Sequence, residues 1–166
     1  MNYESFTRKI YTIEALVFEE VYETELGETL NEYEVEDLFN VLFNTVTLQR
    51  YGIQNEMTYS ISYDARRTIC KFYKNSNSIL LLPWGMNPLT ICHEVAHYLT
   101  NKIAPDLPGH GPTFMSIFIS LCIEASPILG FHLLWKVQEY KIPYRPKIIN
   151  TDELCNSFME RNHVGF

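Results

Sequence analysis

The chain has 166 residues, of which 46% are hydrophobic and 20% charged, and its formal net charge is −7. This length and composition predict one globular domain spanning residues 1–166, and they exclude an intrinsically disordered chain or a fibrous repeat. The acidic balance argues against a nucleic-acid partner, because phosphate binding needs clustered lysine and arginine.

The first half of the chain predicts two helices followed by a small sheet. Apolar residues recur at steps of three and four from Tyr3 to Val21, which is the period of an amphipathic helix. A second helix is expected over about residues 34–50, where a Tyr-Gly pair ends it. Short segments rich in β-branched and aromatic residues then predict three strands: 57–63, 68–73 and 78–83. We expect the first two strands to pair antiparallel.

The second half predicts helices separated by turns rich in proline. Asn87 and Pro88 are typical of an N-cap and a first helical position, so a helix should run from there to about Asn101. Residues 104–112 predict a loop by their prolines and glycines. Further helices are expected to begin near three residues: Pro112, Pro127 and Thr151. Helices, a small sheet and then helices indicate an α+β fold.

Cysteine usage and the apolar runs indicate a cellular location. The four cysteines include no C-x-x-C pair, so neither a disulfide framework nor a cysteine zinc site is expected. Small buried side chains in a reducing compartment are the favoured interpretation. The first twenty residues contain acidic residues throughout and no apolar core, so we expect no signal peptide. No stretch reaches the roughly 18 apolar residues of a membrane span. We therefore expect a cytoplasmic protein.

Residues 93–97 spell H-E-x-x-H inside the helix that follows Asn87. On a helix, His93 and His97 leave the same face one turn apart and can both ligate one metal ion. Glu94 is rotated by about 100° from His93, so it can reach a metal-activated water as general base. A chance match is the alternative, but a capped helix directly after an apolar strand favours a zinc site.

A catalytic zinc usually takes three protein ligands and keeps a fourth position for water. The downstream candidates for the third ligand are His110, Glu124, His132, His163 and Asp106. His110 is favoured, because flanking glycines allow the backbone a close approach and the loop is long enough to return. Glu124, on a later helix, is the main rival. His132 lies in an apolar stretch and is expected to be a core or helix-face residue, and His163 near the end of the chain is expected to be exposed.

The H-E-x-x-H motif followed by H-G-P-x-F at residues 110–114 resembles the SprT-like zinc metallopeptidases. The likeness is greater to small minimal-zincin metallohydrolases of bacteria and phages, because residues 7–18 resemble their opening helix and residues 79–83 their strand before the motif. It covers most of the chain and is strong over residues 78–121. The resemblance implies a zincin-like fold, a zinc ion held by His93, His97 and His110, and activation of water by Glu94. Because the chain lacks a basic tail and a cysteine zinc ribbon, DNA-linked proteolysis is not implied.

These observations predict a zinc-dependent hydrolase, with a peptidase favoured and a protein or peptide as substrate. Glu94 would take a proton from water and deliver it to the leaving amine. By analogy with zincins, residues 77–83 would form the edge strand with which an extended substrate pairs. Candidate oxyanion stabilisers are three tyrosines: Tyr98, Tyr140 and Tyr144. A carboxylate that orients a ligand could be Asp64 or Asp106.

Two other functions stay open at this stage. One is a non-catalytic binding module whose zinc is structural, although such sites normally have four protein ligands and give Glu94 no purpose. The other is hydrolysis of a small amide or ester, which would use the same site residues. The substrate, the oligomeric state and any regulation are not encoded in the patterns described.

Overall fold

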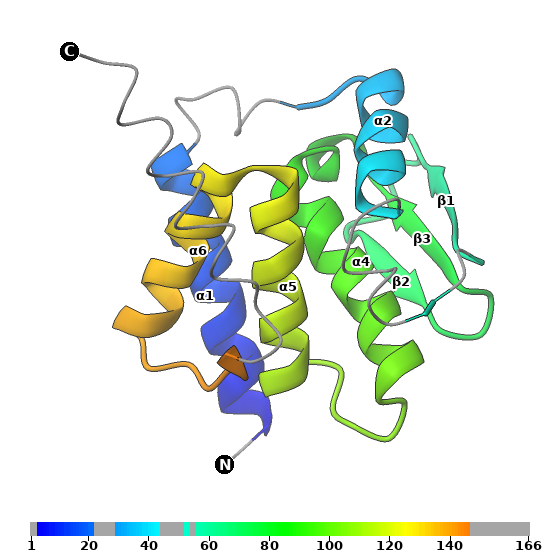
Figure 1. The fold of residues 1–166 in the computed structure, drawn as a ribbon. Coiled ribbons are helices and arrows are strands. Elements are labelled where there is room, and N and C mark those ends of the chain that lie inside the picture. The colour runs from blue at the N-terminus through cyan, green and yellow to red at the C-terminus, as the bar shows by residue number, and fades with distance from the viewer. Residues whose placement is uncertain (1–2, 22–28, 44–51, 54–55, 147–166) are drawn as a thin grey trace.

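The computed structural model describes residues 3–21, 29–43, 52–53 and 56–146 (Figure 1). In this part of the chain, five α-helices and a small three-stranded mixed sheet form an α+β arrangement. None of the described helices is long and apolar enough to cross a membrane. The helix expected over residues 151–162, together with Cys155 and His163, lies outside the described residues.

Two helices open the chain, as their apolar periods predict. Helix α1 covers Tyr3–Val21 and buries one stripe of apolar side chains against the core. Helix α2 covers Glu32–Phe43, two residues earlier than expected, because a reciprocal cap fixes its start. The Asn31 side chain accepts from the Glu34 backbone N–H at 3.1 Å, while the Glu34 carboxylate accepts from the Asn31 N–H at 2.7 Å. The expected continuation of α2 lies outside the described residues.

The sheet contains the three expected strands, but their pairing differs from the prediction. Strands β1 (Thr58–Ile61), β2 (Lys71–Tyr73) and β3 (Ser78–Leu81) have the order β1-β3-β2. Strand β3 pairs parallel with β1 and antiparallel with β2, so the expected antiparallel pair of the first two strands is wrong. The expectation that residues 77–83 form an edge is also wrong, because β3 is the central strand.

Burial explains why β3 takes the centre. Its last three residues are all buried, whereas exposed residues alternate with half-buried ones in β1 and β2. A strand covered on both faces needs a continuous apolar run, and only β3 offers one. Strand β2 therefore forms the edge nearest α4.

The motif helix begins where the sequence predicts. After a short 3₁₀ turn, η2 (Pro83–Gly85), helix α4 covers Pro88–Ile103. Its N-cap is Asn87, whose side chain accepts from the Thr90 backbone N–H at 2.9 Å. The apolar residues of α4 from Leu89 to Leu99 are buried in the core, and this packing fixes the orientation of the helix and of its two histidines.

Helices α5 (Pro112–Ala125) and α6 (Pro127–Glu139) complete the described fold, both beginning at the expected prolines. Figure 1 shows α5 between α4 on one side and α1 with α6 on the other, with the sheet beyond α4. All residues of α5 from Thr113 to Ile123 are buried, so this helix is the centre of the core. Helix α6 approaches α5 closely at Gly130, where a Cβ atom would lie 2.7 Å from the Ile123 backbone.

Candidate metal centre

Three histidines from two elements converge on one point. His93 and His97 lie one turn apart on α4, and His110 comes from the loop immediately before α5. The Nε2 atom of His93 lies 3.0 Å from that of His97 and 3.2 Å from that of His110. One ligand atom from each residue lies within 4.8 Å of the others, so the three are close enough to hold a metal ion.

The histidine cluster is held in place by the protein core. His93 and His110 are buried, and His97 is partly buried. The ring of Phe114 contacts all three imidazoles, with ring centroids 4.6 to 5.1 Å apart. The His97 ring also forms a hydrogen bond with the backbone of Gly109. The ligand geometry therefore depends on the packing of α5 against α4.

A carboxylate from the first helix orients the His93 ring. The Nδ1 atom of His93 contacts the Glu14 carboxylate, although the two residues are 79 positions apart. A carboxylate on the far nitrogen fixes the tautomer and aims Nε2 at the metal position. Neither expected carboxylate does this, because Asp64 pairs with Arg66 at 2.9 Å and Asp106 is exposed.

The position of Glu14 in the sequence indicates that it needs a partner. The buried stripe of α1 contains Ile10, Ile13 and Val17. Position 14 is four residues after the first of these and three before the last, so it lies on that stripe. A charged residue on an apolar stripe needs a partner, because burial of an unpaired charge is costly. Here the partner is His93.

The electrostatic environment keeps two of the three imidazoles neutral. Burial, reinforced by repulsion from His93, lowers the pKa of His97 to about 2 and that of His110 to about 4. Burial also lowers the pKa of His93, but attraction to Glu14 and the hydrogen bond that His93 donates to the Glu14 carboxylate outweigh burial and raise this pKa above its usual value. Neutral imidazoles present a free lone pair, which is the form that ligates metals.

Glu94 lies beside the histidines with its carboxylate directed at the sheet edge. It is buried, and its Oε2 atom accepts from the backbone N–H of Phe72 in β2 at 2.6 Å. Burial raises the pKa of the Glu94 carboxyl, against the opposing attraction of His93 and the hydrogen bond from Phe72. A carboxylate whose pKa is raised is a stronger base and is better able to accept a proton.

A cavity of about 640 Å³ opens beside the cluster and reaches all three histidines and Glu94. Tyr11 of α1 lines it, with its ring 5.9 Å from that of His93 and 5.4 Å from that of His110. None of the three tyrosines named from the sequence lines this cavity. Tyr98 is buried and accepts from the Glu56 backbone N–H at 3.4 Å. The tyrosine at the site is thus one that the motif spacing did not indicate.

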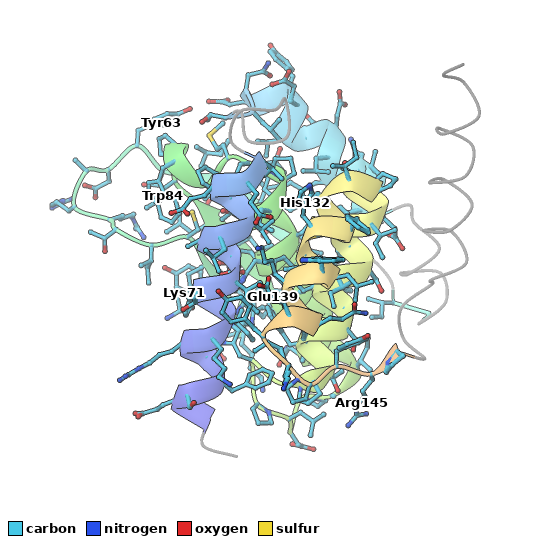
Figure 2. The ribbon with its side chains drawn as sticks, turned by 90° about the vertical axis from the view of Figure 1, so that its left-hand side faces the viewer. Tyr63, Lys71, Trp84, His132, Glu139 and Arg145 are labelled. Carbon is cyan, nitrogen blue, oxygen red and sulfur yellow. The ribbon has the colours of Figure 1, made fainter. Side chains whose placement is uncertain are left out.

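The other candidate ligands lie away from the cluster. Glu124 belongs to the last turn of α5, about 18 Å along that helix from Pro112. His132 lies on the face of α6 turned to α1, where its Nδ1 atom is 3.1 Å from the Glu20 carboxylate (Figure 2). His132 is therefore a helix-face residue, as predicted. Of the described residues that could ligate a metal, only His93, His97 and His110 come together.

No family model, curated protein or solved structure matches the chain. The zincin-like fold and the likeness to SprT-like proteins therefore stay predictions that rest on the sequence pattern.

Proposed function

We propose that the protein is a zinc-dependent hydrolase, and more specifically a peptidase. One observation carries this proposal: three imidazole nitrogens and a buried carboxylate with a raised pKa meet at the wall of one large cavity. A metal-assisted hydrolase needs these groups together, and a structural site would have no use for the carboxylate.

The donor set fits zinc. Zinc–nitrogen bonds of about 2.0–2.1 Å at tetrahedral angles separate the ligand atoms by about 3.3 Å. The two Nε2 separations of 3.0 and 3.2 Å are close to that value. Three imidazole nitrogen ligands suit a borderline-soft cation and leave a position for water. Zinc bound there would supply Lewis acidity, which polarises a carbonyl group and acidifies water.

Glu94 is the proposed general base. It lies one residue from a metal ligand, and its raised pKa matches the task of taking a proton from the attacking water and returning it to the leaving amine. The Phe72 backbone N–H holds one carboxylate oxygen. The other oxygen is then available for water.

The position of β2 favours a peptide as substrate. The Phe72 N–H is directed to Glu94 and hence away from β3, so the outer edge of β2 borders the site. Four consecutive residues, 69–72, line the cavity beside it. An extended chain can pair with such an edge by β-augmentation. This assigns to β2 the substrate-binding role that the sequence suggested for residues 77–83.

Tyr11 is the proposed oxyanion stabiliser. Its ring lies at the mouth of the cavity, 53% exposed and close to two of the metal ligands. A phenol at this position can donate a hydrogen bond to the oxygen on which negative charge develops.

The first test is metal content, measured in protein purified without added metal. We expect about one zinc per chain in the wild type, nearly none in His110→Ala, and an unchanged value in the matched Glu124→Ala variant. Loss of zinc from Glu124→Ala, or no zinc in the wild type after reconstitution, contradicts the proposed centre.

A second test separates a catalytic site from a structural one. In cobalt-substituted protein, acetohydroxamate should change the visible absorption spectrum, because an open coordination position accepts an added ligand. An unchanged spectrum would indicate a closed site. Hydrolysis of fluorescence-quenched peptide libraries, compared with hydrolysis of small amides and esters, then decides between a peptidase and a small-molecule hydrolase.

A further inference from the structure

The cavity has a second half, beside the metal ligands, that the proposed chemistry does not use. Five apolar side chains from four parts of the chain line it: Ala15, Phe18, Ile69, Trp84 and Leu89. They come from α1, the segment before β2, η2 and the start of α4. Figure 2 shows Trp84 and Lys71 along the same side of the molecule, next to α1.

Two of these apolar side chains are more than half exposed. Ile69 is 59% exposed and Trp84 is 57% exposed, and both border the cavity. Scattered exposed hydrophobic residues need no explanation, but those that gather around one concave site mark a binding surface.

Local packing fixes Trp84 at the cavity. A Cβ atom on the neighbouring Gly85 would collide with the Cys70 sulfur, so η2 lies directly against the segment that carries Ile69. The Leu82 backbone N–H donates to Cys70 Sγ at 3.2 Å, and the Asn87 side chain donates to the Trp84 carbonyl at 3.1 Å. Specific contacts therefore hold the backbone of η2 and of the segment before β2 in place on this side of the cavity.

The two carboxylates that line the cavity already have partners. Its acidic residues, Glu14 and Glu94, are engaged by His93 and by the Phe72 N–H. Lys71 is exposed, with its ammonium 5.7 Å from the ring centroid of Tyr73. A substrate carboxylate could pair with Lys71, whereas the apolar side chains of this half offer a charged group no partner.

We propose that this half of the cavity, lined by Phe18, Ile69, Trp84 and Leu89, receives a bulky apolar side chain of the substrate beside the scissile bond. The protein then selects peptides by a large aliphatic or aromatic residue. This inference rests on the proposed function, since the metal centre defines where the scissile bond lies.

The chain offers a direct probe of occupancy. It contains two tryptophans, Trp84 and the exposed Trp135 on α6, so Trp135→Phe leaves Trp84 as the sole indole. In this zinc-loaded variant, 4-phenylbutanohydroxamate should bind at least about tenfold more tightly than acetohydroxamate, because only its tail buries apolar surface. Its binding should also change the Trp84 emission. Equal affinities for the two hydroxamates overturn the inference and leave the zinc centre intact.

Substitutions at two exposed isoleucines, one inside and one outside the cavity, test where the phenylbutyl tail binds. Ile69→Ser, made in the Trp135→Phe background, should remove most of the preference for the phenylbutyl tail while acetohydroxamate binding stays unchanged. Ile128→Ser, an exposed isoleucine on α6 outside the cavity, should keep the preference. A preference that survives Ile69→Ser places the tail elsewhere and contradicts the proposal.

A binding measurement on metal-free protein distinguishes an error in the proposed apolar pocket from an error in the proposed metal centre. The non-chelating 4-phenylbutanamide should change Trp84 emission in metal-free protein, and Ile69→Ser should weaken that response. If acetohydroxamate does not bind but the amide does, the apolar pocket stands and the zinc proposal fails. If the amide leaves Trp84 emission unchanged at concentrations up to its solubility limit, the pocket is overturned.

Discussion

The two walls of the cavity differ in how firmly they are built. On the side formed by α4 and the loop before α5, His93 is 5% exposed and His110 is 8% exposed, and Phe118, which packs against His93, is fully buried. On the facing wall, Tyr11 and Trp84 are more than half exposed. The proposed metal ligands are thus set in the core, whereas the proposed oxyanion stabiliser Tyr11 and the apolar residue Trp84 are largely exposed to solvent.

This difference has a physical reason. A metal site needs its ligand atoms within a few tenths of an ångström, and only close-packed side chains hold such positions. A recognition surface must first be solvated and then release its water when the substrate binds. The protein therefore places each kind of group in the environment that its task requires.

The largest expected effect is on the buried wall. Glu94→Gln should lower kcat/KM for peptide hydrolysis by about 10²–10⁴-fold, because the amide cannot accept the proton of the attacking water. Zinc content should stay near that of the wild type, since Glu94 is not among the clustered ligands. Wild-type activity in this variant, measured at equal zinc content, would remove Glu94 from the mechanism.

A stability comparison tests the contrast between the walls directly. Phe118→Ala should lower the free energy of unfolding by about 3–5 kcal/mol, because Phe118 is fully buried and packs against His93 at 5.5 Å between ring centroids. Trp84→Ala, on the exposed wall, should change it by less than about 1 kcal/mol. Urea denaturation of the two variants gives the measurement. Similar losses would mean that the two walls are equally structural.

Removal of the Glu14 carboxylate, which links α1 to His93, is expected to have an intermediate effect on zinc affinity. Glu14→Gln should weaken zinc binding by about 10- to 100-fold, because the His93 ring loses the carboxylate that orients it. Glu19→Gln, an exposed position on the same helix, is the matched control. Zinc competition with a chromophoric chelator measures both. Equal affinities in the two variants would show that Glu14 does not support the site.

The smallest expected effect is on stability, from substitution of Asn87, which contacts both α4 and Trp84. Asn87 caps α4 with its Oδ1 atom and donates from Nδ2 to the Trp84 carbonyl. Asn87→Ala should therefore cost about 1 kcal/mol of unfolding free energy. Asn87→Asp keeps the cap acceptor and should recover most of that loss. If the aspartate variant is as unstable as the alanine variant, the bond to Trp84 matters more than the cap.

The local features of the fold could be predicted from the sequence. Apolar steps of three and four indicated α1, and Asn87 with Pro88 marked the start of α4 because capping chemistry acts within one turn. The ligand pair His93 and His97 follows from the same helical period. His110 could be named because it lies in a loop that is long enough to return to α4, and few other suitable ligands do.

The features that depend on distant contacts could not be predicted in the same way. The antiparallel pairing expected for the first two strands was wrong, because alternation shows which face of a strand is buried and does not show its neighbour. The apolar run of residues 79–82 is typical of a strand covered on both faces, and the structure places β3 at the centre of the sheet. The sheet order then decided that β2, not β3, borders the site.

By itself, then, the sequence determined the approximate positions of the helices, the Asn87 cap and the three histidines, since each depends on contacts within a turn or across one loop. The tertiary structure alone decided that Glu14 supports His93, that Tyr11 stands over the ligands and that Ile69 and Trp84 share a wall. These partners come from segments far apart in the chain. Only the packing of α1 and the sheet around α4 brings them together.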